Sequence, residues 1–386
     1  MQVEQAEAVL ATAHARFQKA IADRDYRALE RKRHQQLSDR NVLARGALEA
    51  ANNAFSQADA HVALERVSKV FTRKPDFAER IAISLGWPEP PIVRAVDGVS
   101  LAVDHGEALG LVGESGCGKS TLGRIVAGVH AKSGGRFEFE GREEADWSTA
   151  EAKRARLDIQ MIFQDPMSSL NPRKRIADII GEAPVVHGLV QARDREDAVA
   201  ALMREVGLDP DYARRFPHQF SGGQRQRIGI ARALAVQPKF LVCDEAVAAL
   251  DVSIQAQVLN LFMDLRERRG LTYLFISHDL GVIEHLTDRV AIMYLGRIVE
   301  VGPTREIFAG PAHPYTQALL EEAPRIGRGR RVYAPLKGEL PSPLAPPPGC
   351  RFHTRCPYVM PVCKIEAPEL KQIAAGRIAA CHLNDK

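Results

Sequence analysis

The sequence predicts an α/β protein, with a largely parallel sheet flanked by helices and extended by smaller segments at both ends. Two observations predict this class. Short apolar segments alternate with amphipathic helical stretches from about residue 61 to residue 310, and this alternation is typical of parallel sheets. A glycine-rich stretch, Gly113–Thr121, stands between the first apolar segment and a predicted helix, which is the setting of a phosphate-binding loop.

Composition divides the chain into four regions. Residues 1–60 are rich in Ala, Arg, Glu and Gln and contain no Pro, so they predict a helical extension of one or two solvated helices, to which we assign no chemistry. Residues 61–310 form the α/β core. Its predicted strands are 108–112, 158–163, 240–243, 273–276 and 290–294. Residues 166–238 are long and helical enough for a subdomain. Residues 311–386 gather prolines and four of the six cysteines and predict a small appended domain.

The composition is that of an ordinary globular protein. The chain has 386 residues, 45% of them hydrophobic, and 52 basic residues against 48 acidic ones give a net charge of +4. This balance lacks the basic field expected of a nucleic-acid-binding protein, so we expect no nucleic-acid partner. No apolar run approaches the ~18 residues needed to cross a bilayer. The first residues lack the basic-then-apolar order of a secretory signal, so we expect the chain to stay in the cytoplasm.

The stretch Gly113–Thr121 has the spacing G-x-x-x-x-G-K-S, which binds the phosphates of a nucleotide triphosphate. Glycines allow the backbone amides to turn toward the phosphates, and the helix that follows directs its positive dipole end at them. The lysine reaches the outer phosphates and the serine ligates Mg²⁺. The predicted contacts to ATP are Gly113, Ser115, Gly116, Cys117, Gly118, Lys119, Ser120 and Thr121.

Two later strands end in residues suited to phosphoryl transfer. The apolar strand that begins at Phe240 ends in Asp244 and Glu245, at the edge of the sheet where ligands bind in open α/β folds. Asp244 is expected to hold Mg²⁺ through water, and Glu245 to orient and deprotonate the attacking water. The strand before Ser277 is followed by His278, which can hydrogen-bond the terminal phosphate.

Six motifs occur in the order found in ATP-binding-cassette (ABC) ATPases, and the chain resembles that family from about residue 62 to its end. They are Gly113–Thr121, Gln164, Phe220–Arg227, Asp244–Glu245, Ala249–Asp251 and His278. Further segments narrow the resemblance to the ATPase subunits of bacterial oligopeptide/dipeptide (peptide/nickel) importers. They are Gln164–Pro172, Leu250–Gln257, His313–Thr316 and Gly338–Pro343.

The resemblance implies roles for further residues. Phe71 stacks on the adenine, and Gln164 contacts both Mg²⁺ and the attacking water. The signature, made of Ser221, Gly222, Gly223 and Gln224, closes on ATP held by a partner subunit. Asp251 lines the seam between the two subunits. The chain departs from the family pattern after Glu245, because Ala246 and Ala248 stand where proline and serine are common. Neither position carries a group that acts in hydrolysis.

The implied function is ATP hydrolysis that powers the import of di- and oligopeptides. The implied partners are a second ABC ATPase subunit, identical or a paralogue, two membrane permease subunits and an external substrate-binding protein. The implied location is the cytoplasmic face of the bacterial inner membrane, as a peripheral subunit. The same architecture serves nickel, glutathione and oligosaccharide importers, so these cargoes stay open. A non-transport ABC ATPase of repair or translation is the remote alternative, since the chain has neither an inserted coiled coil nor a second cassette.

Four cysteines stand within the last 37 residues, at Cys350, Cys356, Cys363 and Cys381. A reducing cytoplasm disfavours disulfides. Zinc sites usually begin with cysteines two to four residues apart, so these wider gaps fit zinc poorly, whereas iron–sulfur clusters accept varied spacing. The residues alone leave a cluster, zinc and free thiols open. The resemblance implies a [4Fe-4S] cluster held by all four.

Overall fold

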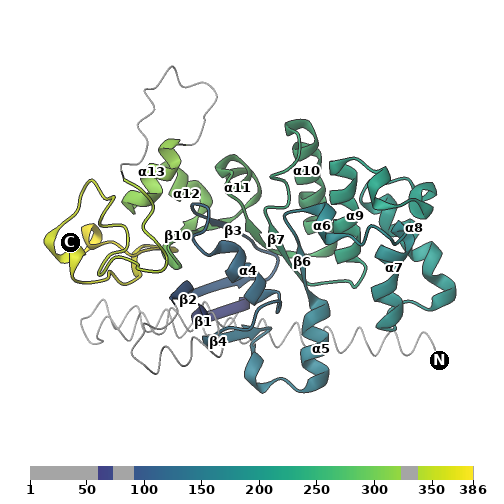
Figure 1. Cartoon of the computed structure of the whole chain (residues 1–386), viewed down its shortest axis with the longest axis horizontal. Coiled ribbons are helices and arrows are strands. Elements are labelled where there is room, and N and C mark those ends of the chain that lie inside the picture. The colour runs from purple at the N-terminus through teal and green to yellow at the C-terminus, as the bar shows by residue number, and fades with distance from the viewer. Residues whose placement is uncertain (1–59, 73–90, 323–337, 386) are drawn as a thin grey trace, which may run out of the picture.

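The computed structural model describes residues 60–72, 91–322 and 338–385. It contains one eight-stranded sheet, one four-stranded sheet, and helices on both sides of the larger sheet (Figure 1). The predicted helical extension lies outside the described residues, apart from Ala60, which begins the first strand. In the described part of the chain, no helix is long and apolar enough to cross a membrane.

The eight-stranded sheet has the order β11-β12-β10-β9-β3-β8-β7-β6. Neighbouring strands from β9 to β6 are parallel, and those from β9 to β11 are antiparallel. The strands are β3 Ala108–Val112, β6 Ile159–Ile162, β7 Phe240–Asp244, β8 Thr272–Ile276, β9 Arg289–Tyr294, β10 Arg297–Pro303, β11 Lys371–Ala374 and β12 Arg377–Ala379. The five predicted strands are therefore confirmed within a residue or two at each end.

The four-stranded antiparallel sheet, in the order β2-β1-β4-β5, was not predicted. Its strands are β1 Ala60–Thr72, β2 Ile92–Asp104, β4 Gly134–Phe139 and β5 Arg142–Glu143. The two long strands alternate polar and apolar residues with several register shifts, and this irregular pattern is harder to read than a continuous apolar run.

Helices cover the larger sheet on both faces. They are α4 Lys119–Val126, α5 Thr149–Asp158, α10 Val252–Arg269, α11 Leu280–Leu286, α12 Thr304–Ala309 and α13 Pro314–Glu322. Buried residues form two clusters, one on each face, because successive side chains of a strand point to opposite sides. In β8, Tyr273 and Phe275 belong to one cluster, and Leu274 and Ile276 belong to the other.

A helical region projects from the end of the sheet that carries β6, at the right of Figure 1. Its α-helices are α6 Pro166–Ser169, α7 Ile176–Val186, α8 Arg195–Glu205 and α9 Gly222–Leu234. They lie within residues 166–238, where the sequence predicts a helical subdomain. Short 3-10 turns occur at 144–146, 192–194, 210–214, 217–219, 361–364 and 382–384.

The C-terminal region is joined to the core rather than merely appended. Strand β12 pairs with β10 through Glu300 opposite Ala379, so the core sheet continues into the residues that follow 370. The side chain of Glu300 is fully buried, where it accepts hydrogen bonds from the backbone N–H groups of Ala312 at 2.9 Å and His313 at 3.0 Å. Arg377 donates to the same carboxylate at 3.1 Å. A buried charge with three donors fixes this junction.

Candidate functional site

A cleft of about 540 Å³ opens at the carboxyl ends of the parallel strands. It is lined by residues from seven separate parts of the chain. They are Val93, Arg94, Ala95, Ser115 to Thr121, Gln164, Glu245, His278, Leu295, Gly296 and Pro343. The structure therefore brings the predicted phosphate loop and the three predicted catalytic side chains to one place.

The phosphate loop needs its glycines for space and for backbone conformation. Gly118 has a φ of 110°, and a Cβ there would lie 2.1 Å from the carbonyl oxygen of Ala95. A Cβ on Gly113 would lie 2.1 Å from the carbonyl oxygen of Met293. Helix α4 begins at Lys119, so its unpaired amides face the cleft. The loop is thus a backbone cradle for an anion.

Lys119 is held inside the loop. Its side chain is buried, and its Nζ donates to the carbonyl oxygens of Gly113 at 2.7 Å and Glu114 at 3.0 Å. Next to it, the Ser120 hydroxyl donates to Oδ1 of Asp244 at 2.7 Å. Burial raises the pKa of Asp244 although the Ser120 hydrogen bond lowers it. A bound cation would favour the ionised form. Ser120 and Asp244 form the oxygen pair suited to Mg²⁺.

Glu245 lies at the centre of the catalytic group. Gln164 donates from Nε2 to Oε2 of Glu245 at 2.6 Å, and Nδ1 of His278 lies 3.3 Å from Oε1. The backbone of Glu245 has a φ of 49°, a strained conformation that non-glycine residues adopt mainly where the surroundings fix it. Two features fix this conformation. Glu245 directly follows the end of β7, and its N–H donates to the carbonyl oxygen of Ile276 at 2.9 Å.

The signature lies on the surface at the start of α9. Ser221 is the N-cap, and its hydroxyl accepts from the N–H of Gln224 at 3.3 Å, while the Gln224 side chain accepts from the N–H of Ser221 at 3.0 Å. A Cβ on Gly223 would lie 2.3 Å from the Ile254 side chain, which explains the glycine. None of the four signature residues is among the described residues that line the cleft of their own chain.

Two predicted positions, Asp251 and Phe71, are not among the residues that line the cleft. Asp251 is exposed at the start of α10. Phe71 lies at the end of β1, opposite Val93 of the neighbouring strand β2, and Val93 lines the cleft. The Phe71 ring packs edge-on against His130 with 5.7 Å between centroids. Phe71 is not among the residues that line the cleft, although its strand partner Val93 is, and its contact with adenine stays a prediction.

Comparison with known proteins agrees with this geometry. Two family models match the chain: "ABC transporter" over residues 96–248, and "Oligopeptide/dipeptide transporter, C-terminal region" over residues 299–363. The oligopeptide transport ATP-binding protein AppF of Bacillus subtilis is 52% identical over 295 residues, covering 75% of this chain and 90% of AppF. The dipeptide transport ATP-binding protein DppF of Escherichia coli is 47% identical over 296 residues, covering 76% of this chain and 88% of DppF. This chain belongs to the oligopeptide/dipeptide group of ABC transporter ATPases.

Solved structures show the same fold. A dimeric ATP-binding cassette in a post-hydrolysis state, bound to ADP and Pi, gives a TM-score of 0.54 at 26% identity and covers 63% of this chain and 99% of that cassette. CbiO1 of Clostridium perfringens, part of an ABC transporter complex, gives a TM-score of 0.54 at 25% identity, covering 65% of this chain and 92% of CbiO1. The predicted ABC fold is confirmed, and the enzymatic activity of this family is ATP hydrolysis.

The ABC ATPase also holds its phosphate loop from the C-terminal region, a feature that the sequence reasoning missed. Arg355 donates two hydrogen bonds to the Glu114 carboxylate, at 2.8 and 2.9 Å. The Tyr315 hydroxyl accepts from the N–H of Glu114 at 2.8 Å. Arg351 hydrogen-bonds the Leu295 carbonyl and Asp97 beside the opposite end of the cleft. The His-Pro-Tyr-Thr motif contained Tyr315, but nothing in the motif indicated its partner.

The four C-terminal cysteines of the ATPase line a single pocket, together with Phe352, His353 and His382. All are free thiols. Burial raises the pKa of the Cys350 thiol to about 11, and the neighbouring cysteines act in the same direction. Among the described residues, no three cysteine sulfurs lie within 4.8 Å of one another. The four thiols therefore share a pocket without being gathered as one metal-ligand group.

Proposed function

We propose that this ATPase powers the import of di- and oligopeptides from the cytoplasmic face of the bacterial inner membrane. The observation that carries the proposal is the junction of a complete nucleotide cleft with the oligopeptide/dipeptide C-terminal region in one body. The relatives named as peptide transport proteins align with this chain over about nine-tenths of their length. Their names support a peptide cargo. The two regions share a sheet and an ion pair, so they act as one subunit.

Each side chain of the cleft has a distinct role in hydrolysis. The amides of the phosphate loop and Lys119 hold the β- and γ-phosphates, and Ser120 with Asp244 would hold Mg²⁺, which neutralises charge on the phosphates. Glu245 accepts the proton of the attacking water. Gln164 and His278 both contact Glu245, so they orient its carboxylate as well as the water and the terminal phosphate.

A second cassette completes the site. The signature caps the start of α9 on the surface, where its amides can receive an anion, yet it does not line its own cleft. The γ-phosphate of an ATP molecule held in the cleft of a partner subunit fits this helix end. Asp251 and the neighbouring Val252, whose side chain is 83% exposed, supply a polar and an apolar contact to the seam. Two composite ATP sites form per dimer.

The helical subdomain, residues 166–238, provides the contact with the membrane permease subunits. A hollow of about 320 Å³ lies between α7 and α8, lined by Lys174, Asp178, Gly181, Glu182, Val185, Val186 and Arg195. Val186 is 73% exposed at its rim. A short helix with an apolar tip and polar flanks fits such a surface. Because Gln164 immediately precedes α6, closure around ATP moves this docking surface.

The cysteine pocket is suited to a [4Fe-4S] cluster held by Cys350, Cys356, Cys363 and Cys381. The support is the single shared pocket and the four free thiols that line it. When bound, the cluster would supply a covalent staple between the segments that carry these thiols. Protein purified without air should be brown and lose its visible absorbance in Cys356→Ser. Colourless protein that contains zinc instead would contradict this assignment.

Uptake by whole cells tests the proposed cargo. Deleting the gene should abolish uptake of labelled di- and oligopeptides, and the wild-type gene should restore it while Glu245→Gln should not. The external substrate-binding protein and the permeases should copurify with the ATPase from solubilised membranes. Unchanged peptide uptake together with lost uptake of nickel, glutathione or an oligosaccharide would move the function to that cargo.

A further inference from the structure

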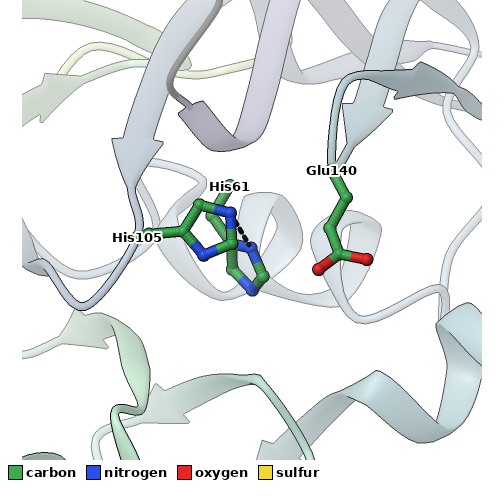
Figure 2. Close-up of side chains that lie close together, drawn as sticks. All are labelled: His61, His105 and Glu140. Atoms are coloured by element: carbon green, nitrogen blue, oxygen red, sulfur yellow. Dashed lines mark hydrogen bonds between the residues drawn. The ribbon is translucent and has the colours of Figure 1, made fainter. Parts of the chain in front are cut away.

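A cluster of two histidines and a glutamate lies outside the nucleotide cleft. His61 stands at the start of β1, His105 in the turn between β2 and β3, and Glu140 in the turn between β4 and β5. In the described part of the chain, these three are the one group whose possible ligand atoms all lie within 4.8 Å of one another. Figure 2 shows the two rings in contact and the Glu140 carboxylate beside them.

The geometry of the histidine pair matches a metal site. Nδ1 of His61 and Nε2 of His105 are 3.2 Å apart. Zn–N bonds of about 2.0–2.1 Å at tetrahedral angles place neighbouring nitrogens roughly 3.3–3.4 Å apart. The same distance also fits a hydrogen bond between neutral rings. A small adjustment would therefore convert the pair from hydrogen-bond partners into two ligands of one ion.

The surroundings hold both histidines in place. The His61 ring is 1% exposed and packs beside Phe139, with 4.8 Å between ring centroids. Its second nitrogen, Nε2, is buried without a hydrogen-bond partner among the described residues. The turn of His105 is fixed at Gly106, whose N–H donates to Thr272 at 2.9 Å.

The carboxylate is placed to complete the set. The N–H of Glu140 donates to the carbonyl oxygen of His61 at 3.0 Å, so the two backbones are joined. Glu140 has a φ of 52°, in a turn where glycine, asparagine or aspartate is usual. Its carboxylate accepts from Lys239 at 2.6 Å. Lys239 and Glu140 are both exposed, so the ammonium can leave when another cation arrives.

We propose that His61, His105 and Glu140 form a binding site for a divalent transition-metal ion, with Zn²⁺ as its first candidate. Two imidazoles and one carboxylate form a ligand set that zinc accepts, with water in the fourth position. Bound metal joins the start of β1 to two turns from other parts of the chain, and thereby stabilises the folded state of the four-stranded sheet. Lys239 competes with the metal for Glu140.

Zinc titration of the full chain by calorimetry tests this assignment. His105→Ala and Glu140→Gln alter exposed side chains and should each weaken one binding event about tenfold or more. Lys239→Met should tighten the same event about fivefold, because it removes a competing charge. Glu144→Gln, an exposed acid of the same hairpin region, is the matched control and should leave the binding unchanged. The cysteine pocket is identical in all these variants, so differences between them isolate this site.

Two further readouts separate ligation from folding. Co²⁺ should give weak visible bands of nitrogen and oxygen ligation that disappear in His105→Ala, without the strong thiolate absorption of a cysteine site. Zn²⁺ should raise the melting temperature of wild type and Lys239→Met more than that of Glu140→Gln. Binding curves that are the same in wild type, His105→Ala and Lys239→Met, or a Co²⁺ spectrum of thiolates alone, would overturn the proposal.

Discussion

Replacing Arg355 with methionine is expected to lower both the stability of the fold and the affinity of the phosphate loop for ATP. Arg355 acts on the loop through Glu114, which lies 241 residues earlier in the chain. Arg355 is 7% exposed and Glu114 is 22% exposed in their side chains, and the guanidinium donates two hydrogen bonds to the carboxylate. Methionine keeps much of the apolar volume of the arginine stem. The substitution therefore removes the charge and its hydrogen bonds with little loss of packing.

The magnitude follows from burial. Removing one partner of a fully buried ion pair costs ~3–5 kcal/mol of unfolding free energy. Because Glu114 keeps about a fifth of its exposure, water recovers part of that, and we expect a loss of ~2–3 kcal/mol. The carbonyl of Glu114 also accepts from Lys119. If about 1 kcal/mol of the pair's energy orders the loop for ATP, the Kd for ATP rises about fivefold.

A double-mutant cycle measures the interaction itself. Unfolding in urea, followed by circular dichroism, gives the free energy for wild type, Arg355→Met, Glu114→Gln and the double variant, and a fluorescent nucleotide gives the ATP affinity. The coupling between the two positions should be ~2 kcal/mol. Arg268→Ala breaks an exposed pair with Asp264 at 3.9 Å and should change stability by less than ~0.5 kcal/mol. Additive effects at Glu114 and Arg355, with unchanged ATP affinity, would refute the reasoning.

Three other changes test separate parts of the structure. Glu245→Gln should lower ATP turnover by about 10²–10⁴-fold while ATP still binds and converts monomers to dimers in sedimentation; an unchanged hydrolysis rate would remove Glu245 from catalysis. Gly223→Ala should cost ~1–3 kcal/mol of stability, since its Cβ meets Ile254, and should weaken that dimer; full dimer formation would argue against the signature contact. Burial lowers the pKa of His313 to about 4. Between pH 6.5, its pKa in the unfolded chain, and about pH 4, only the unfolded chain binds the proton. The free energy of unfolding therefore falls as the pH is lowered through this range. Between pH 7.5 and 5 the advantage of wild type over His313→Gln should shrink by ~2 kcal/mol in urea unfolding, and a difference independent of pH would contradict it.

Features that depend on local chemistry were predictable from the residues alone. The glycine spacing around Lys119 can be read directly, because a phosphate cradle needs consecutive backbone amides and particular φ values. Apolar strands that end in Asp244 and Glu245 or in Ser277 and His278 were likewise readable, since parallel strands deliver their carboxyl ends to one edge. The order of these motifs was enough to predict the cleft.

Contacts between residues far apart in sequence could be seen only in the folded chain. The pairing of Arg355 with Glu114 and the junction of β12 with β10 depend on how the C-terminal region packs on the core. Phe71 has the residue type of an adenine platform, and the register of β1 on β2 sets it opposite Val93, which lines the cleft. Side-chain convergence of this kind leaves no periodic or spaced pattern in the sequence, because it is fixed by packing between elements rather than within them.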